Sequence, residues 1–551
     1  MNRKLLKIGS VATGIFAADY FLLDNSLKRN LRTLSYGALI TADYKLNFTI
    51  GNAEKIGSLH KRTAERISYV CRENGGLYIK FGQQIASLNH VLPEEYAEIF
   101  YKFFDEAPSA DFERVIKIFK NDFGVHPDEL FDEFSVHPIA SASIAQVHSA
   151  KIKGTTTKVA IKIQKPEIKN QMFWDFQMYK FVTFCFEKLF DLPLCWSFDY
   201  IQRHFQSELD FINEGKNSEI CAQHFSKVKN LRENCYVPKI YWDRSSSRVL
   251  TQEWIDGVKL NKTLLEKNSF SSKTVMEVVV DIFSNQIFRS GFVHCDPHQG
   301  NILIRPHPLQ KNKPQIVLID HGLYVSCSPE FVQNYALFWK SLFTQDSQTL
   351  EEIVKNWGMS DIQMFATMTL QKPWKKDVAI HIPQKPDLRE IYEMQVEAKQ
   401  RIQKFLTNTN LIPKELIFIG RNLNIVRSLN KHLNSPVNRI NLMATCAVKS
   451  LGPDWSVWER NTMRDLSFKR YDYNKDFINS FIMFFKSRLN YLKFQTTLLV
   501  SAIGFRFSKT LQMLQYYILN TQSGGFEEHL DKQMKEASKK IGFEIRDPFD
   551  G

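Results

Sequence analysis

Two stretches of this 551-residue chain decide its fold: Val293-His-Cys-Asp-Pro-His-Gln-Gly-Asn-Ile-Leu-Ile304 and Gln315-Ile-Val-Leu-Ile-Asp-His-Gly322. Their apolar runs predict two short strands that flank a polar loop. The loop carries Asp296 and, five residues later, Asn301, and the second strand ends at Asp320. We expect these three side chains to form one polar site.

The residue types in this site are those that phosphoryl transfer requires. Asn301 and Asp320 would hold divalent cations that bridge phosphates, and Asp296 would orient or deprotonate the acceptor. The spacing D-x-x-x-x-N is that of a kinase catalytic loop. The alternative is an Asx turn at each position, which is the more frequent explanation for one such motif taken alone. Both motifs together favour phosphoryl transfer.

A second group of residues lies upstream. Val159-Ala-Ile-Lys162 predicts an apolar strand whose lysine stem is buried while its ammonium reaches phosphates, which makes Lys162 a second catalytic candidate beside Asp296. The alternative is a lysine at a strand edge that faces solvent. Glu214 follows Lys162 at the point in the chain where a helix carboxylate that fixes the lysine is expected. A solvated acidic helix face explains Glu214 equally well from the residues alone.

Nucleotide contacts are also predicted from the backbone. No G-x-G-x-x-G sequence precedes Lys162, and small residues occupy that place, where the chain could approach phosphates closely. We expect the adenine to lie at a junction between two lobes, beside the backbone that follows a strand ending at Glu253. The predicted phosphate loop consists of Ala140, Ser141, Ala142 and Ser143.

The remaining pattern is that of an α+β protein. Helical periodicity runs from 27 to about 127, with an apolar stripe at 75–96 and a break before Pro93, because the residue before proline leaves the helical region. Further helices are predicted at 93–103, 174–220 and 271–291, and beyond 329 almost to the end. Strands are predicted at 159–164, 237–242 and 249–255, and turns at 372–386 and 452–454.

The amino-acid composition limits the possible functions. Hydrophobic residues make up 44% of the chain and charged residues 24%, as in a globular protein. The formal net charge of +13 favours acidic partners such as nucleotide phosphates or an anionic bilayer. The basic residues are dispersed and carry no nucleic-acid-binding signature, which argues against nucleic acid. Eight scattered cysteines without a C-x-x-C pair indicate a reducing compartment, and nothing marks Cys295 as a nucleophile.

The N-terminal segment predicts targeting. It contains Arg3, Lys4 and Lys7 and no acid before Asp19, with apolar residues between small ones. This pattern resembles a mitochondrial presequence or signal anchor. Ile8 to Ala18 is too short to span a bilayer, so a cleaved targeting segment and a weak anchor are both open.

Taken together, the motifs resemble the UbiB (aarF-domain) family of atypical kinases. Its motifs occur in the family's order from Leu27 to Phe343 and continue weakly beyond, and Glu208 to Gly215 and Gly291 to His298 look like the mitochondrial aarF-domain-containing kinase 1 branch. Cys295 and Gln299 depart from the residues common in relatives, and neither is a predicted phosphate or metal ligand. The matching segments are Lys80-Phe-Gly-Gln83, Ala140 to Ser143, Val159 to Lys162, Glu208-Leu-Asp210, His294 to Asn301 and Asp320-His-Gly322.

The resemblance implies a two-lobed protein-kinase-like fold that binds ATP or ADP with Mg2+ or Mn2+. It also implies that Lys80, with Gln83 on the same helix face, folds over the active site and pairs with Glu208 and Asp210, where a protein substrate would otherwise bind. Further implied features are an association with the mitochondrial inner membrane and a role in coenzyme Q or lipid homeostasis and in cristae organisation.

The predicted function is therefore an ATP-dependent kinase or ATPase acting on a small or lipid-like substrate. The alternative is a nucleotide-binding scaffold that acts through partners without phosphoryl transfer. Protein kinase activity is disfavoured, since no A-P-E sequence follows Asp320 to hold a peptide-binding segment. The expected parts are a targeting segment or anchor (1–24), a helical extension (25–130), an N-lobe (131–255), a C-lobe (256–400) and a helical C-terminal region (401–551).

Overall fold

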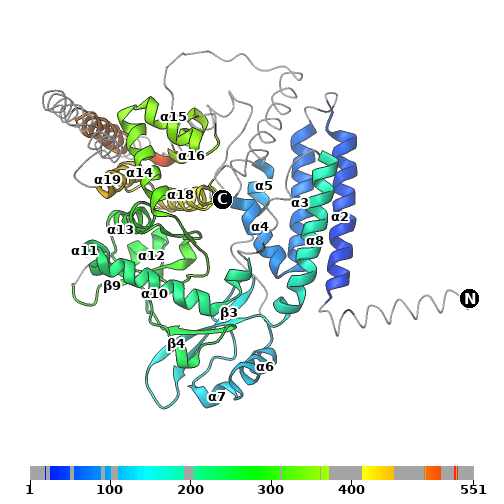
Figure 1. Cartoon of the computed structure of the whole chain (residues 1–551). Coiled ribbons are helices and arrows are strands. Elements are labelled where there is room, and N and C mark those ends of the chain that lie inside the picture. The colour runs from blue at the N-terminus through cyan, green and yellow to red at the C-terminus, as the bar shows by residue number, and fades with distance from the viewer. Residues whose placement is uncertain are drawn as a thin grey trace, which may run out of the picture.

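The smaller lobe is built on a five-stranded antiparallel sheet (Figure 1). The computed structural model of the chain describes residues 19, 25–49, 52, 55–87, 94–100, 110–190, 202, 205–310, 313–359, 362–370, 413–451, 489, 492–510, 526–528 and 530. The predicted targeting segment, apart from Asp19, and the turns at 372–386 and 452–454 lie outside these residues.

The sheet of the smaller lobe has the order β1-β3-β4-β6, with β2 paired to β3. Its strands are β1 (Phe131–Asp132), β2 (Ala140–Ser141), β3 (Ala145–Ile152), β4 (Lys158–Gln164) and β6 (Val249–Glu253).

Alternation along β4 separates a core face from a cleft face. Val159, Ile161 and Ile163 are fully buried against α6 (Phe112–Phe123) and the short α7 (Pro127–Leu130) region, while Lys162 points to the other side. A strand with period two places alternate side chains on opposite faces. The apolar residues of β4 therefore fix the direction of Lys162.

The larger lobe contains two small sheets and a helical core. A four-stranded sheet has the order β5-β10-β9-β7, and β8 pairs with β11 in a separate ribbon. The strands of these two sheets are β5 (Cys235–Tyr236), β7 (Val258–Lys259), β8 (Phe292–His294), β9 (Ile302–Pro306), β10 (Pro314–Leu318) and β11 (Tyr324–Ser326). Of the two predicted strands, the one before the polar loop is present as β8 and the one that leads to Asp320 as β10, while β9 follows the loop between them.

Helices fill the rest of the larger lobe. A cap at Ser271, whose hydroxyl accepts from the Thr274 amide, begins α13. The apolar side of α13 packs against α18 and α19, and α14 packs against α19 in the same core. The boundary expected at residue 400 therefore does not divide this core. The helices are α10 (Phe211–Lys227), α11 (Lys229–Asn234), α12 (Lys262–Lys267), α13 (Ser272–Asn285), α14 (Pro329–Thr344), α15 (Ser347–Asn356), α16 (Ile362–Leu370), α18 (Glu415–His432) and α19 (Arg439–Ser450), with short turns η3 (Trp242–Arg244), η4 (Gln286–Ser290) and η5 (Gln299–Asn301).

Two predicted elements differ from the structure. The strand expected at 237–242 is wrong: β5 ends at Tyr236, and beyond it only Ile240 bridges to Gln252. Pro238 accounts for this, because proline lacks the amide that a ladder requires. The helix expected at 174–220 is instead α8 (Glu167–Phe190) and, after a non-helical turn at Leu209 and Asp210, α10.

The N-terminal extension forms a helical layer beside both lobes (Figure 1). It consists of α2 (Ser26–Asn47), α3 (Ile56–Asn74), α4 (Leu77–Ser87) and α5 (Glu94–Phe100), and α8 joins it by packing against α2 and α4. Phe81 of α4 stacks on Tyr179 of α8 with ring centroids 5.0 Å apart. This stacking fixes α4, which carries Lys80, against the rest of the molecule. The predicted α+β class with helices at both ends is confirmed.

Candidate functional site

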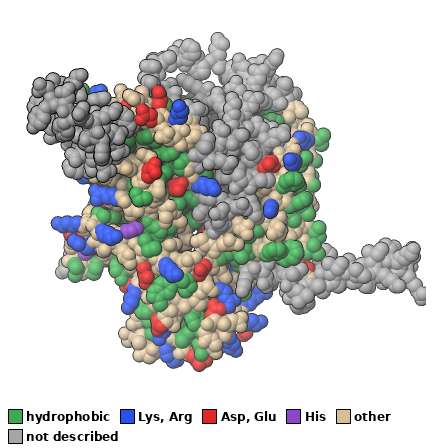
Figure 2. All heavy atoms as spheres, in the orientation of Figure 1, with side chains coloured by type: hydrophobic (Ala, Val, Ile, Leu, Met, Phe, Trp, Pro, Cys, Tyr) green, Lys and Arg blue, Asp and Glu red, His purple; other side chains and the backbone are tan. Residues whose placement is uncertain are grey.

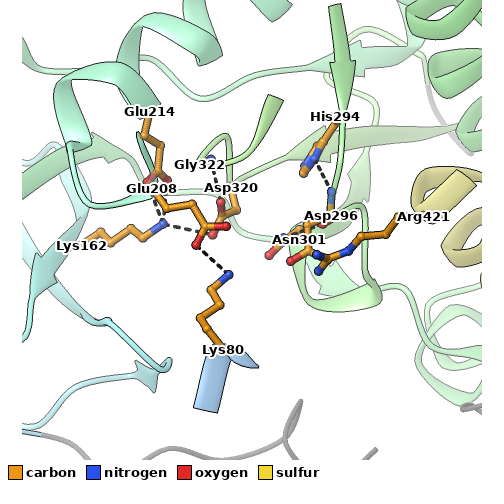
Figure 3. A network of polar contacts seen from close by, with 10 residues as sticks. All are labelled: Lys80, Lys162, Glu208, Glu214, His294, Asp296, Asn301, Asp320, Gly322 and Arg421. Atoms are coloured by element: carbon orange, nitrogen blue, oxygen red, sulfur yellow. Dashed lines mark hydrogen bonds and ion pairs between the residues drawn. The ribbon is translucent and has the colours of Figure 1, made fainter. Parts of the chain in front are cut away.

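Lys162 is the centre of a buried charge network between the lobes (Figure 3). Its Nζ lies 2.7 and 2.9 Å from the two carboxylate oxygens of Glu214 and 3.0 Å from Oδ2 of Asp320. Glu214 lies in the first turn of α10, where Asp210 caps the helix by accepting from the Ile212 amide. The pairing of Lys162 with Glu214 that chain order suggested is therefore present, and a second acid joins it.

Opposite charges in this network stabilise each other. Burial disfavours the ionised forms of Lys162 and Asp320, yet the acids Asp320 and Glu214 raise the pKa of Lys162. Lys162 in turn holds the pKa of Asp320 well below its ordinary value. Burial raises the pKa of Glu214 to about 7 against the opposing charge of Lys162. Asp320 thus remains an ionised carboxylate at neutral pH. Its side chain is 36% exposed, so that it opens to the cleft.

Gly322 completes the turn around Asp320. Its amide donates to Oδ1 of Asp320 at 3.0 Å. A Cβ at this position would lie only 3.3 Å from the same oxygen, so a larger residue would press on the carboxylate. The glycine in Asp320-His-Gly322 therefore has a local steric reason.

The polar loop holds Asp296 and Asn301 next to each other. The amide of Asp296 donates to Nδ1 of His294 at 3.1 Å, and the side-chain amide of Asn301 donates to the carbonyl of Asp296 at 3.0 Å. His294 is fully buried, and burial lowers its pKa to about 4, so it is a neutral acceptor. The loop is thus shaped by its own side chains, which leaves the Asn301 side-chain oxygen as the atom that can coordinate a cation.

Two further residues reach this loop from α18. Nη2 of Arg421 lies 3.0 Å from Oδ1 of Asp296, and the Asn422 side chain donates to the His294 carbonyl at 2.6 Å. Although Asp296 is buried, Arg421 lowers its pKa to about 2. Sequence reasoning missed both residues because they follow the loop by more than a hundred positions and form no motif with it. The available signal was an adjacent polar pair between the apolar residues Phe418, Ile419, Leu423 and Ile425.

Lys80 of α4 closes the cleft from the N-terminal extension. Its Nζ lies 3.0 Å from Oε2 of Glu208, and both side chains are mostly buried. Burial opposes its charge, but Glu208 and Asp296 raise the pKa of Lys80. The implied pairing therefore involves Glu208, whereas the carboxylate of Asp210 caps α10. Gln83 lies one turn after Lys80 on α4 and is partly buried.

The predicted phosphate loop forms the bend between β2 and β3. Ala140 and Ser141 pair with β3, and the bend that follows is closed by a bond from the Ala142 amide to the Ala145 carbonyl. Nζ of Lys165 donates to the Ala142 carbonyl at 2.5 Å, and Ser143 is buried. This bend lies at the end of the sheet that carries Lys162. Contact of Ala140 to Ser143 with a nucleotide stays a prediction.

Glu253 ends β6, where the chain passes from one lobe to the other. Its carboxylate accepts from the Tyr236 hydroxyl at 2.5 Å and from the Lys239 amide at 3.3 Å, and its own amide donates to the Lys239 carbonyl. The side chain thus holds the lobe junction together. Adenine recognition by the backbone here also stays a prediction.

The donor atoms fit a magnesium nucleotide. Within the described residues, no three His, Cys, Asp or Glu side chains converge on a metal site. Mg2+ in nucleotide enzymes is held by one or two carboxylates together with the phosphates, and its ligands are oxygens. Asp320 and Asn301 would supply those oxygens, and Lys162 would meet the phosphates.

The two lobes and the cleft residues define the class of protein: a kinase-like fold with the acids and lysine of a phosphoryl-transfer site. The model of the ABC1 atypical kinase-like domain matches residues 102–354. The ABC1 family protein C10F6.14c of Schizosaccharomyces pombe is 36% identical over 450 residues, which cover 81% of this chain and 83% of its own. The AarF domain-containing protein kinase 1 of Gallus gallus is 30% identical over 484 residues, which cover 85% and 91%.

The chain therefore belongs to the ABC1/AarF family of atypical kinases, as its motifs suggested. Among solved structures, the Rv3197–erythromycin complex from Mycobacterium tuberculosis aligns over 65% of this chain and 96% of its own, with 19% identity and a TM-score of 0.39.

Proposed function

We propose that this protein binds ATP or ADP with Mg2+ and transfers or hydrolyses the terminal phosphoryl group of ATP. The observation that supports this most strongly is the meeting of Lys162, Glu214 and Asp320 across the cleft from Asp296 and Asn301. These residues come from four separate segments and reproduce the parts that phosphoryl transfer needs.

Each side chain has a separate task in this proposal. Lys162, held by Glu214, offers a fixed positive charge to the nucleotide phosphates, and Asp320 and Asn301 present oxygens to the cation. When bound, Mg2+ neutralises charge that develops on the phosphates. Asp296, with its pKa of about 2, is a weak base, so it orients an acceptor hydroxyl more effectively than it removes the proton.

The acceptor in this proposal is a small or lipid-like molecule. Lys80 and α4 occupy the space beside Glu208 and Asp296, where an extended peptide would approach Asp296. A small acceptor needs only a narrow path to Asp296. The same contacts disfavour ordinary protein kinase activity.

A nucleotide-binding scaffold is the second candidate. The ion pair between Arg421 and Asp296 favours it, because a carboxylate bound to a guanidinium is less available to an acceptor. In that case the nucleotide would bias the arrangement of α4 and α18, and a partner would recognise the resulting state.

The cellular setting is also proposed. The basic N-terminal sequence supports a mitochondrial location, and the resemblance to the UbiB family suggests the inner membrane, with a role in lipid or coenzyme Q homeostasis and cristae organisation. These roles rest on family analogy. Imaging of the full-length tagged chain, compared with a chain that lacks residues 1–24, would test the location.

Thermal unfolding of the purified chain with Mg-ATP or Mg-ADP tests nucleotide binding. A ligand that binds only the folded state stabilises it by about 2.7 kcal/mol at a hundredfold excess over its Kd. We expect this shift in the wild type and its loss in Asp320→Asn and Lys162→Ala. Lys273→Ala, which removes an exposed lysine from α13, is the matched control and should keep the shift. A well-folded wild type that neither nucleotide stabilises would reject the proposal.

A further inference from the structure

The outer surface of α2 and α8 is apolar although it faces solvent. On α8, the large apolar side chains Phe173, Trp174, Phe181, Phe184 and Leu189 are between 39% and 58% exposed. Spacings of three (Phe181 to Phe184), seven (Trp174 to Phe181) and eleven residues (Phe173 to Phe184) place most of them on one side of the helix. A contiguous exposed apolar surface of this kind marks an interaction site more often than isolated exposed residues do.

The neighbouring helix α2 continues this surface. Leu31, Leu34, Leu39 and Leu46 are between 37% and 73% exposed. Figure 2 shows hydrophobic side chains gathered along the edge of the molecule that α2 and α8 form in Figure 1. Tyr69 of α3, which is 42% exposed, lies against Tyr36 of α2 and extends the same side.

The two helices are held in a fixed arrangement. Nη2 of Arg29 lies 2.5 Å from Oδ2 of Asp175, and both side chains are buried between α2 and α8. Near the other ends of the helices, Nζ of Lys45 donates to the Leu189 carbonyl at 2.7 Å. The helices therefore run parallel and side by side, so that their exposed residues form one surface, here called the α2–α8 face.

Lysines predominate among the charges on this face. The exposed residues of α2 and α8 include Lys28, Lys45, Lys180 and Lys188, whereas Glu167 and Glu187 are only partly exposed. Asp175 is buried with Arg29, and Asp43 is paired with Arg62 and Arg66 of α3. Aromatic and leucine side chains flanked by lysines are the composition of helices that lie in an anionic membrane interface.

We propose that the α2–α8 face docks on the surface of an anionic phospholipid bilayer, with its phenylalanines and leucines inserted between headgroups and its lysines next to lipid phosphates. Within the described residues, no helix is long and apolar enough to cross a membrane. The proposed contact is with the bilayer surface. This inference rests on the proposed function only for the membrane as the place of action. It does not require phosphoryl transfer.

Charge distinguishes this occupant from a second copy of the chain. A symmetric dimer through the α2–α8 face would bring lysines of one copy towards those of the other, and the acids on the described parts of these helices are at most partly exposed. An anionic bilayer offers the complementary charge. The N-terminal sequence, which joins α2 at Asn25, adds Arg3, Lys4 and Lys7.

Flotation of the purified chain with phosphatidylcholine vesicles, with and without an anionic phospholipid, tests the proposal. We expect binding to the anionic vesicles that weakens as salt rises. The double variant Phe181→Glu and Phe184→Glu should lose at least about tenfold in partitioning, and Lys180→Glu with Lys188→Glu a similar amount. The matched control is Leu309→Glu, since Leu309 is 89% exposed on a loop of the larger lobe. It should bind like the wild type.

Three results would overturn the proposal: no flotation of the wild type, equal flotation of wild type and the phenylalanine variant, or a wild-type dimer that this variant converts to monomer. The third result would assign the face to self-association. Nucleotide-induced thermal shifts should be the same in all these variants. A chain that floats but shows no nucleotide shift would reject only the proposed chemistry, and the reverse would reject only the docking face.

Discussion

The two aspartates of the cleft, Asp296 and Asp320, are held in different ways. Asp320 contacts Lys162 of the smaller lobe, whose other partner is Glu214, whereas Asp296 contacts Arg421 of a helix more than a hundred residues away. Asp320 is also the more exposed, at 36% of its side chain against 11% for Asp296. The difference teaches that the proposed nucleotide end of the cleft is preformed and open, while the proposed acceptor end is closed by parts of the chain outside the two sheets.

The largest expected effect comes from breaking the Lys162 network. Lys162→Ala removes the cation that compensates Glu214 and Asp320, and breaking a buried pair costs about 3 kcal/mol or more in unfolding free energy. Lys162→Met should cost less, because its stem still packs. Urea unfolding of the three proteins measures this. Equal stability of Lys162→Ala and the wild type would show that the network is not a stabilising feature.

Removal of Arg421 should have a smaller effect that depends on pH. Asp296 has a folded pKa of about 2, below its ordinary value, so its contribution of about 2 kcal/mol is present above about pH 4 and is lost as pH falls towards 2. In Arg421→Ala, the charge of Arg421 no longer offsets the burial of Asp296. The loss of unfolding free energy as pH falls should therefore be smaller than in the wild type. Arg421→Lys should keep part of it.

Unfolding free energies measured between pH 2 and 5, as far as the proteins stay reversible, compare these variants. A wild-type profile parallel to that of Arg421→Ala would show that the ion pair does not control Asp296.

A smaller effect is expected from the contact that closes the cleft. Lys80→Met removes a cation that competes with Mg2+ for Asp296 and Asp320, so the affinity for Mg2+ at saturating nucleotide should rise several-fold, while unfolding free energy falls by about 1 kcal/mol. Glu208→Gln breaks the same ion pair but keeps the cation. Calorimetric titration should therefore show tighter binding only for Lys80→Met, and an identical change in both variants would assign the effect to the opening of α4.

The smallest effect should follow from Cys295→Ala. The thiol is fully buried against Leu323 and Phe418, and burial raises its pKa well above the ordinary range. We expect a loss of about 1 kcal/mol in stability and unchanged nucleotide affinity. In native protein, Cys295 should resist thiol reagents, and rapid labelling of this residue would contradict the description of it as a packing residue.

The sequence predicted the nucleotide end of the cleft better than the acceptor end. Short motifs, whose spacing follows from a strand, a helix turn and a loop, carry Lys162, Glu214, Asn301 and Asp320. The same reasoning found Asp296 at the acceptor end but not the residues that hold it. Arg421 and Asn422 reach the same loop only through the packing of α18, and local spacing contains no information on that packing. Pro238 is a local example. The apolar run at 237–242 predicts a strand, but Pro238 lacks the amide that strand pairing requires.

Phosphate release from Mg-ATP, measured beside nucleotide binding, tests the central claim most directly. We predict that the wild type binds and turns over ATP, that Asp320→Asn loses both, and that Asp296→Asn keeps binding but loses turnover. A wild type that binds nucleotide without turnover, or Asp296→Asn turning over as fast as the wild type, would contradict the account. The first result would favour the scaffold, and the second would remove Asp296 from the chemistry.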